Sequence, residues 1–346
     1  MDILELLKFT ISAGASDLHL NAGAPPMVRV DGVMKKIDVP DLLPEDIHRL
    51  IYDIMTDKDR KRFEETWELD FSRDIGGIGR FRVNVYYQNE GKAAVFRTIP
   101  SKILTFEELH LPEVLKSFCF LEKGLVLVTG PTGSGKSTTL AAMVDHINTH
   151  RKSHIITIED PIEFVHKSRN CLISQREVGR DTKSFSNALR SALREDPDVI
   201  LVGELRDLET ISLAISAAET GHLVFGTLHT NSVAKTVDRI VDVFPTNQQE
   251  QIRSMFADSI EGVVSQLLLR RKSGKGRVAA LEILVATNAV RSLIRENKTH
   301  QIKSALQTGS SLGMCTMEQA IRKLIQEGAI SVEMAKEILP KLEVET

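Results

Sequence analysis

The stretch GPTGSGKSTT, residues 130–139, has the residue types of a site for nucleotide phosphates and matches the pattern G-x-x-x-x-G-K-S/T between an apolar run and a helical pattern. Glycines let backbone N–H groups turn toward phosphates, and the helix N-terminus adds the positive end of its dipole. We expect Lys136 to contact the β- and γ-phosphates of ATP or GTP and the Ser137 hydroxyl to bind Mg²⁺. The alternative is a glycine-rich turn that only caps a helix. The predicted phosphate-binding residues are Gly130, Thr132, Gly133, Ser134, Gly135, Lys136, Ser137 and Thr138.

Acidic residues follow two further apolar runs that are predicted to be strands. Glu159 and Glu163 come at and after the end of HIITIED, and Glu204 ends DVILVGE. Because ligands of open parallel sheets bind at the carboxyl ends of the strands, we expect these acids near the phosphate loop. We predict that Glu204 orients the attacking water beside Mg²⁺ and that Glu159 and Glu163 position water or metal. Helix capping or a solvated loop charge is the alternative for each acid, and Asp160-Pro161 is itself typical of a turn.

Two histidines stand at the ends of a third apolar run, in TGHLVFGTLHTN. If residues 222–229 form one strand, seven steps of about 3.3 Å place His222 and His229 roughly 23 Å apart, so they cannot share a metal ion. His229 is then at the carboxyl edge with the phosphate loop, and we predict that it senses the γ-phosphate. His222, at the opposite edge, is expected to pack or to lie in a subunit interface. A structural histidine with satisfied hydrogen bonds is the alternative for His229.

These residues need a parallel sheet to bring them together, and the second half of the chain has the corresponding pattern. GLVLVTG, HIITIED, DVILVGE and HLVFGTLH are short aliphatic runs separated by helix-length segments. This alternation predicts an α/β fold with a parallel sheet covered by helices on both faces. Residues 1–98 indicate a smaller α/β domain with two hairpins, one turning at Asp31-Gly32 and one following RFRVNVYY. We expect a linker over 99–123, the nucleotide-binding core over 124–286 and a helical region over 287–346.

The composition excludes several classes of protein. Of the 346 residues, 42% are hydrophobic and 26% are charged, with a net charge of −3. This balance is typical of folded soluble domains and indicates no constitutive binding to nucleic acid or anionic membranes. The three scattered cysteines offer no disulfide framework or C-x-x-C metal site, and no apolar run approaches the roughly 20 residues of a membrane span. We therefore expect a cytoplasmic protein that is not inserted in a membrane.

Together the motifs resemble the secretion and type IV pilus ATPase superfamily over nearly the whole chain. The resemblance rests on ASDLHL, GRFRVNVY, GPTGSGKSTT, IEDPIEF, SFSNALRSALREDPDVILVGELRD, TGHLVFGTLHTN and AVRSLIRE. Extension and secretion ATPases of the superfamily usually carry a four-cysteine zinc site, which three isolated cysteines cannot form, so the pilus retraction branch is favoured. The retraction signature AIRNLIRE reads AVRSLIRE here, with Val290 and Ser292 substituted. We expect this segment to be an amphipathic helix with Ala289, Leu293 and Ile294 inward and with Arg291 and Arg295 exposed.

The resemblance implies a PAS-like N-terminal domain, a RecA-like P-loop ATPase domain and a helical C-terminal region. It implies a homohexameric motor that hydrolyses ATP, uses Mg²⁺ and drives pilus retraction and twitching motility at an inner-membrane pilus platform protein. The motor would be cytoplasmic and peripherally associated with the inner membrane at the pilus base.

The resemblance also implies that arginines of the N-terminal domain reach the nucleotide of a neighbouring subunit. Arg82 and Arg97 match these positions, and Arg80 lies beside them in the sequence. A cation delivered from a neighbour stabilises transition-state charge only when the interface is closed, which suits a ring motor. A solvated basic sheet face is the alternative for these arginines. The alternatives for the whole protein are a paralogous accessory motor, an extension or secretion ATPase, and an ATP-binding scaffold with little turnover.

Overall fold

This computed structural model describes residues 2–30, 32–99, 102–274 and 276–344, with side chains up to residue 339. The chain divides into two compact units, of which the first comprises Met1–Lys102 with Pro161–Val165 and the second comprises Ile103–Asp160 with His166–Thr346. None of the helices described below combines the length and the apolar character that a bilayer span needs.

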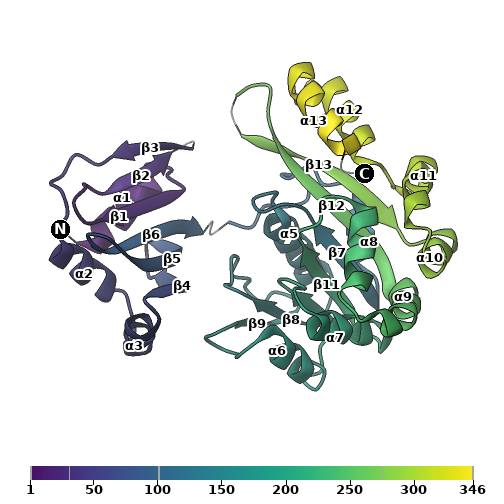
Figure 1. The fold of residues 1–346 in the computed structure, drawn as a ribbon, viewed down its shortest axis with the longest axis horizontal. Helices are drawn as coiled ribbons and strands as arrows, with labels where there is room; N and C mark the ends of the chain where they lie inside the picture. Colours follow the sequence, from purple (N-terminus) through teal and green to yellow (C-terminus); the bar gives the residue numbers. More distant parts are fainter. Residues whose placement is uncertain (1, 31, 100–101, 275, 345–346) are drawn as a thin grey trace. The chain divides into compact units, whose positions relative to one another are not determined.

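The first unit is an antiparallel sheet with helices on one face (Figure 1). The six strands lie in the order β3-β2-β1-β6-β5-β4. The predicted hairpins are confirmed: β2 pairs with β3 through Val30 and Val33, and β5 pairs with β6 through Gln88 and Gly91. Asp31 of the first turn lies outside the described residues. The elements are α1 (Ile3–Ser12), β1 (Asp17–Asn21), β2 (Met27–Val30), β3 (Val33–Lys36), α2 (Pro44–Tyr52), α3 (Asp57–Thr66), β4 (Glu68–Ile75), β5 (Gly79–Gln88) and β6 (Gly91–Ile99).

Alternation along β5 explains why one face of this sheet is covered. Phe81, Val83 and Val85 are fully buried in a cluster with residues of α1, α2 and α3, while Arg80 and Arg82 occupy the other face. The sequence therefore separates an apolar face, which needs helices, from a charged face that carries the predicted arginines.

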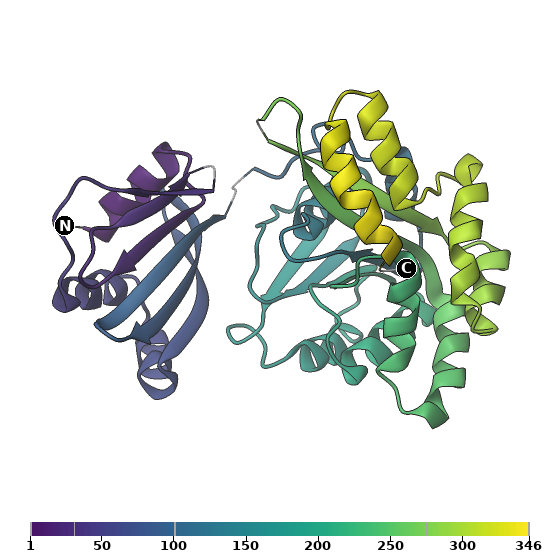
Figure 2. The ribbon, with the colours of Figure 1, turned by 45° about the horizontal axis from the view of Figure 1, so that its top comes forward.

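The second unit is a seven-stranded sheet with helices on both faces (Figures 1 and 2). The strand order is β13-β12-β7-β11-β10-β8-β9, and neighbouring strands are parallel except for the antiparallel pair β12–β13. Its elements are α4 (Glu113–Cys119), β7 (Gly124–Thr129), α5 (Lys136–His150), β8 (His154–Glu159), β9 (Leu172–Glu177), α6 (Phe185–Ala192), β10 (Val199–Val202), α7 (Leu208–Glu219), β11 (Leu223–Leu228), α8 (Val233–Asp242), α9 (Thr246–Ser259), β12 (Ile260–Arg270), β13 (Arg277–Val285), α10 (Asn288–Arg295), η1 (Thr299–Gln301), α11 (Ile302–Thr308), η2 (Ser310–Leu312), α12 (Met317–Gln326) and α13 (Val332–Val344).

The central strands are apolar on both faces because each face meets a different set of helices. In β7, Leu125 and Leu127 belong to a core with α6 to α11, whereas Val126 and Val128 belong to a core with α4 and α5. This pattern confirms the predicted α/β class with a parallel sheet covered on both sides. The antiparallel hairpin β12–β13 extends that sheet and was not predicted.

The stretch expected to be a linker, residues 99–123, contains a helix and core residues. Phe106, Leu115 and Phe118 are buried in the core that faces α5. The two prolines in this stretch suggested a connection, but Pro112 is the N-cap of α4 and leads into a packed helix. From residue 103 the chain thus forms part of the second unit.

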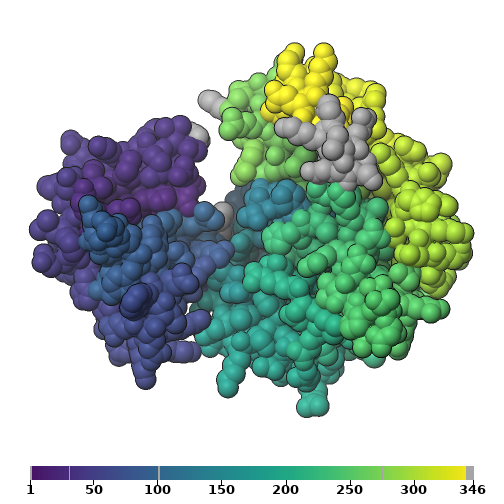
Figure 3. All heavy atoms as spheres, in the orientation of Figure 1, coloured from purple at the N-terminus to yellow at the C-terminus, as the bar shows by residue number. Residues whose placement is uncertain are grey.

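The C-terminal region is helical, as predicted. Figure 3 shows α10 and α11 in yellow-green along the flank where α9 lies in green, and α12 packs against β13. In α10 the predicted burial of Ile294 and exposure of Arg295 are confirmed, but Val290 is buried and Ala289, which was expected inward, is exposed. Arg291 is also largely buried, with 16% of its side chain exposed, since it donates to Ala257 O and Asp258 O and pairs with Glu261.

Candidate active site

The phosphate-loop motif forms the turn between β7 and α5. Gly130, Gly133 and Gly135 have φ angles of +140°, +78° and +88°, in the region that glycine enters without steric cost. A Cβ on Gly130 would lie 2.3 Å from the carbonyl oxygen of Gln266, and one on Gly135 would lie 2.8 Å from Gln266 Nε2. The first N–H groups of α5 have no partner within the helix. The glycine conformations and the unpaired N–H groups at the helix start are the features of an anion-binding loop.

The side chains of the loop fit a phosphate group. Lys136 Nζ donates to the carbonyl oxygens of Gly130 at 2.8 Å and Pro131 at 3.1 Å, so the ammonium group folds back onto the start of the loop. Ser134 is 3% exposed, and its hydroxyl has no hydrogen-bond partner within the described part of the chain. A hydroxyl in this loop without a partner has a donor that a phosphate oxygen could use. The other predicted residues are Thr132 in the loop and Ser137 and Thr138 in the first turn of α5.

Gln266 of β12 fixes the shape of this loop and was missed in the sequence analysis. Its Nε2 donates to Ser134 O at 2.6 Å, and its Oε1 accepts from the Thr139 hydroxyl at 2.8 Å. Gln266 is 3% exposed and Thr139 is 2% exposed, so these bonds do not compete with water. No local motif surrounds Gln266 in the sequence. Its role follows only from the pairing of β12 with β7.

Glu204 and His229 come together at the carboxyl edge of the sheet. Glu204 lies two residues beyond β10, and His229 immediately follows β11, the neighbouring strand. His229 Nε2 is 3.2 Å from Glu204 Oε1, and Arg206 Nη2 is 2.8 Å from Glu204 Oε2. The phosphate loop begins after β7, which pairs with β11 on its other side. The strand order thus brings the predicted loop, acid and histidine to one edge.

The charge of Glu204 is stabilised by its neighbours. Burial of the carboxylate alone would raise its pKa, but the hydrogen bond and charge of Arg206, together with His229, hold the pKa of Glu204 below its ordinary value. The group is therefore ionised at neutral pH and accepts hydrogen bonds only. A carboxylate of low basicity is better suited to orienting a water molecule than to removing its proton.

The other predicted acids have different surroundings. Glu159, the last residue of β8, accepts from the Thr157 hydroxyl at 2.7 Å and from Gln175 Nε2 at 3.2 Å. Its Cα lies 3.3 Å from the position that a Cβ on Gly203 would take, so it borders the turn that leads to Glu204. Glu163 lies in the segment Pro161–Val165, which is grouped with the first unit. The structure thus places Glu159 next to the β10 turn, and the role of Glu163 stays a prediction.

The predicted arginines lie together on the charged face of the first unit. Arg82 and Arg97 are direct cross-strand partners in β5 and β6. Arg82 forms a two-pronged contact with Asp70, with Nη2 to Oδ2 at 2.6 Å, and Arg97 Nε donates to Asp17 Oδ1 at 2.9 Å. Arg80 Nη2 donates to the Ser72 hydroxyl at 2.7 Å. All three arginines hold partners within their own domain, and their action on a neighbouring subunit stays a prediction.

The remaining candidate residues have structural contacts. His222 precedes β11, and its Nδ1 lies 3.0 Å from Ala217 O at the end of α7, in line with the expected packing role. Within the described ranges, the cysteines are free and no three His, Cys, Asp or Glu side chains converge to hold a metal ion. Ser137 is the second residue of α5, and its role as a ligand of Mg²⁺ stays a prediction.

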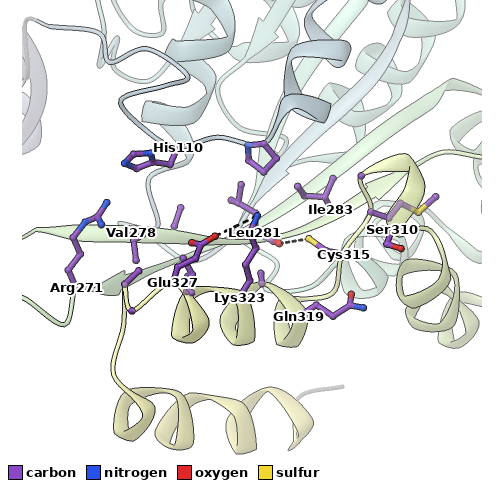
Figure 4. Close-up of a pocket in the computed structure, with 18 of the residues that line it drawn as sticks. His110, Arg271, Val278, Leu281, Ile283, Ser310, Cys315, Gln319, Lys323 and Glu327 are labelled. Carbon is purple, nitrogen blue, oxygen red and sulfur yellow. Dashed lines mark hydrogen bonds and ion pairs between the residues drawn. The ribbon is translucent and has the colours of Figure 1, made fainter.

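A second cavity, of about 930 Å³, lies between β13 and α12 (Figure 4). Val278, Leu281 and Ile283 form its apolar wall, and Lys323 reaches toward it from α12. Cys315 Sγ donates to Leu281 O at 3.1 Å, so the thiol is engaged. This cavity contains none of the predicted site residues.

Comparison with known proteins gives a consistent result. The family model described as type II/IV secretion system protein matches residues 2–339. The chain is 62% identical to the type IV pilus retraction ATPase PilT of Pseudomonas aeruginosa, over 97% of this chain and 98% of the relative. It is 54% identical to a twitching motility protein of Neisseria gonorrhoeae, over 96% and 89% of the two chains. A crystal structure of the pilus retraction motor PilT with bound ADP superposes with a TM-score of 0.91 at 53% identity, covering 97% of this chain and 96% of the other.

Proposed function

The chain belongs to the type II/IV secretion system protein family, and we propose that it is a P-loop ATPase that powers retraction of type IV pili. The observation that carries this proposal is the edge of the second sheet, where the phosphate loop and the Glu204–His229 pair follow neighbouring strands. A scaffold that only binds nucleotide would need the loop but not an ionised acid at that edge. The similarity to PilT and to a twitching motility protein supports retraction as the work performed.

The residues of the site have separate tasks in ATP hydrolysis. ATP supplies the γ-phosphoryl group that is transferred to water, with Mg²⁺ neutralising phosphate charge. The N–H groups of the loop and Lys136 bind the phosphates, and Ser137 offers the hydroxyl that a magnesium ion requires. Glu204 accepts a hydrogen bond from the attacking water and so orients it. His229 contacts Glu204 and senses whether a γ-phosphate is bound. Glu159 supports this edge from β8.

We extend the proposal to the assembly. The protein works as a homohexamer, in which Arg82 and Arg97 of one subunit approach the nucleotide of the next. The partner that receives the mechanical work is an inner-membrane pilus platform protein, which places the ring in the cytoplasm at the pilus base. The cross-strand pairing of Arg82 with Arg97 supports a shared task, because it places both guanidinium groups side by side on the same face of the sheet, each held by an aspartate of its own domain.

Substitution of Glu204 tests the enzymatic part. Glu204→Gln keeps the shape of the side chain but replaces one acceptor oxygen with a donor, so we expect ATP hydrolysis to fall by about 100-fold or more while nucleotide affinity stays within a few-fold. The matched control is Glu209→Gln on α7, an exposed acid that pairs with Arg190. Steady-state phosphate release measures the rate of hydrolysis, and titration with a fluorescent ATP analogue measures the nucleotide affinity. Undiminished turnover of Glu204→Gln would contradict the assignment.

Two further experiments test the motor. In cells that lack their own retraction ATPase, wild-type protein is expected to restore twitching, and Glu204→Gln to leave pili that extend but do not retract. Loss of pili in place of retention would indicate an extension motor.

In mixed rings, Arg82→Ala subunits combined with Glu204→Gln subunits are expected to recover part of the activity if the arginine acts on its neighbour. Rings shown to be mixed but without recovery would argue for a role within the subunit.

A further inference from the structure

A row of buried polar residues crosses three strands just below the phosphate loop. Thr129 of β7 pairs with Ser265 of β12, and Ser265 pairs with Glu282 of β13. Cross-strand partners share a face of the sheet, and this face is the one that α8 covers. Thr129 is 0% and Ser265 is 1% exposed. Polar groups are costly at such positions unless they serve a contact, so each of them invites an explanation.

Glu282 has an explanation in two backbone contacts. Its Oε1 accepts from the N–H of Val233 at 2.8 Å, and its Oε2 accepts from the N–H of Met317 at 3.2 Å. Val233 is the first residue of α8, and Met317 is the first residue of α12. The side chains of Ser232 and Thr316 cap other N–H groups of the same helices. One carboxylate thus completes the starts of two helices and lies at the positive end of both dipoles.

The two helices connect different parts of the second unit. The start of α8 directly follows residues 229–232, the segment that begins with His229. Within this segment the Thr230 hydroxyl lies 2.7 Å from the Thr236 hydroxyl of α8, which donates to Ser232 O at 2.8 Å and lies 3.4 Å from the Thr129 hydroxyl. The start of α12 belongs to the C-terminal region and borders the cavity of Figure 4. Glu282 is hydrogen-bonded to the N-termini of both α8 and α12.

We propose that Glu282 is a positioning residue for ATP hydrolysis, which holds the segment from His229 to Ser232 in place by anchoring α8 to the start of α12. Burial favours the neutral acid and raises the pKa of Glu282, whereas the two backbone N–H donors favour the carboxylate. The geometry suits the carboxylate, since both oxygens of the ionised group are strong acceptors, whereas the hydroxyl oxygen of the neutral acid is a weak one. The proposal rests on the function proposed above, because it acts through His229.

The first test uses Glu282→Gln, which turns one of the two acceptors into a donor that faces a backbone N–H. We expect kcat for ATP to fall about tenfold or more, with ADP affinity within about threefold of wild type. The matched control is Glu318→Gln in the first turn of α12, which removes an exposed pair with Arg322 and is expected to leave kcat unchanged. Equal kcat values for the two variants would overturn the proposal. Absence of turnover in the wild type would refute the proposed function instead.

A double variant separates positioning from general destabilisation. If Glu282 acts through the segment that begins with His229, adding Glu282→Gln to the His229→Ala variant is expected to change its affinity ratio for ADP and an ATP analogue by no more than about twofold. If Glu282 has a merely structural role, the change in this ratio for the double variant is expected to equal the product of the changes for the two single variants. The readout is the ratio of ADP affinity to the affinity for a non-hydrolysable ATP analogue, which remains measurable when turnover is low. Multiplicative effects on this ratio would overturn the proposal.

A proline variant provides a second route if Glu282→Gln does not fold. Met317→Pro removes the N–H that contacts Glu282 Oε2, at a helix position where proline is tolerated. The preceding residue, Thr316, already has the extended ψ of 160° that proline requires. We expect kcat to fall several-fold, whereas the control Asn288→Pro at the start of α10 keeps wild-type kcat. Wild-type kcat in Met317→Pro would show that the anchor on α12 is not needed and would overturn the proposal.

Discussion

Replacement of Gln266 by methionine tests whether β12 shapes the phosphate loop. Gln266→Met keeps the unbranched shape and approximate volume of the side chain, so packing changes little, but it removes the bonds to Ser134 O and the Thr139 hydroxyl. Each buried bond contributes about 0.5–1.5 kcal/mol, so their joint loss amounts to about 1–3 kcal/mol. If the nucleotide must supply this energy to order the loop, the Kd for ADP rises about 5- to 150-fold.

The assay is a titration with a fluorescent ADP analogue, together with urea unfolding to confirm that the variant is folded. Gln248→Met, on the exposed surface of α9, serves as the matched control and is expected to keep wild-type affinity. Hydrogen exchange of the loop amides adds a direct readout, because the loop should exchange faster in Gln266→Met alone. A folded Gln266→Met protein that binds ADP within twofold of wild type would refute the reasoning.

Two further predictions follow from individual residues. Gly130→Ala places a Cβ 2.3 Å from Gln266 O and is expected to abolish ADP binding, whereas Gly133→Ala, where nothing lies within 4 Å of the new Cβ, should lose only about tenfold from left-handed backbone strain. Comparable affinities of the two variants in the ADP titration would contradict this. For His166, burial lowers the pKa to about 4 from 6.5, so the unfolded state binds more protons between these values and stability falls as pH is lowered through that window. Urea unfolding at pH 7.5 and pH 5 is expected to show a smaller loss for His166→Gln than for wild type, and equal losses would count against it.

The phosphate loop and the Glu204–His229 pair could be predicted because the information is local. The loop motif is contiguous, so Gly130 and Lys136 are recognised without knowledge of the fold. Glu204 and His229 each end an apolar run, and the rule that parallel strands present their carboxyl ends at one edge brings them together. The contact of 3.2 Å between them agrees with that inference.

Gln266 and Glu282 could not be predicted, because their roles depend on pairings between distant strands. Each is a polar residue within a mainly apolar stretch, VVSQLLL and ALEILV, and neither stretch has a motif. In α10 the burial of Ile294 was predicted correctly, but the exposure of Arg291 was predicted wrongly for a related reason. Arg291 donates hydrogen bonds to three oxygens from the end of α9 and the start of β12. These bonds allow a charged side chain to be buried at a position where the sequence suggested exposure.

The distance in sequence between Gln266 and the loop also determines when the site can form. Gln266 follows Thr139 by 127 residues and Ser134 by 132 residues. During synthesis, the glycine-rich motif leaves the ribosome long before β12 exists to pair with β7. A nascent chain that ends ahead of β12 therefore carries the whole motif but lacks the strand that gives the loop its shape. We therefore expect full affinity for nucleotide to be gained only after β12 has been made, late in the synthesis of the ATPase domain.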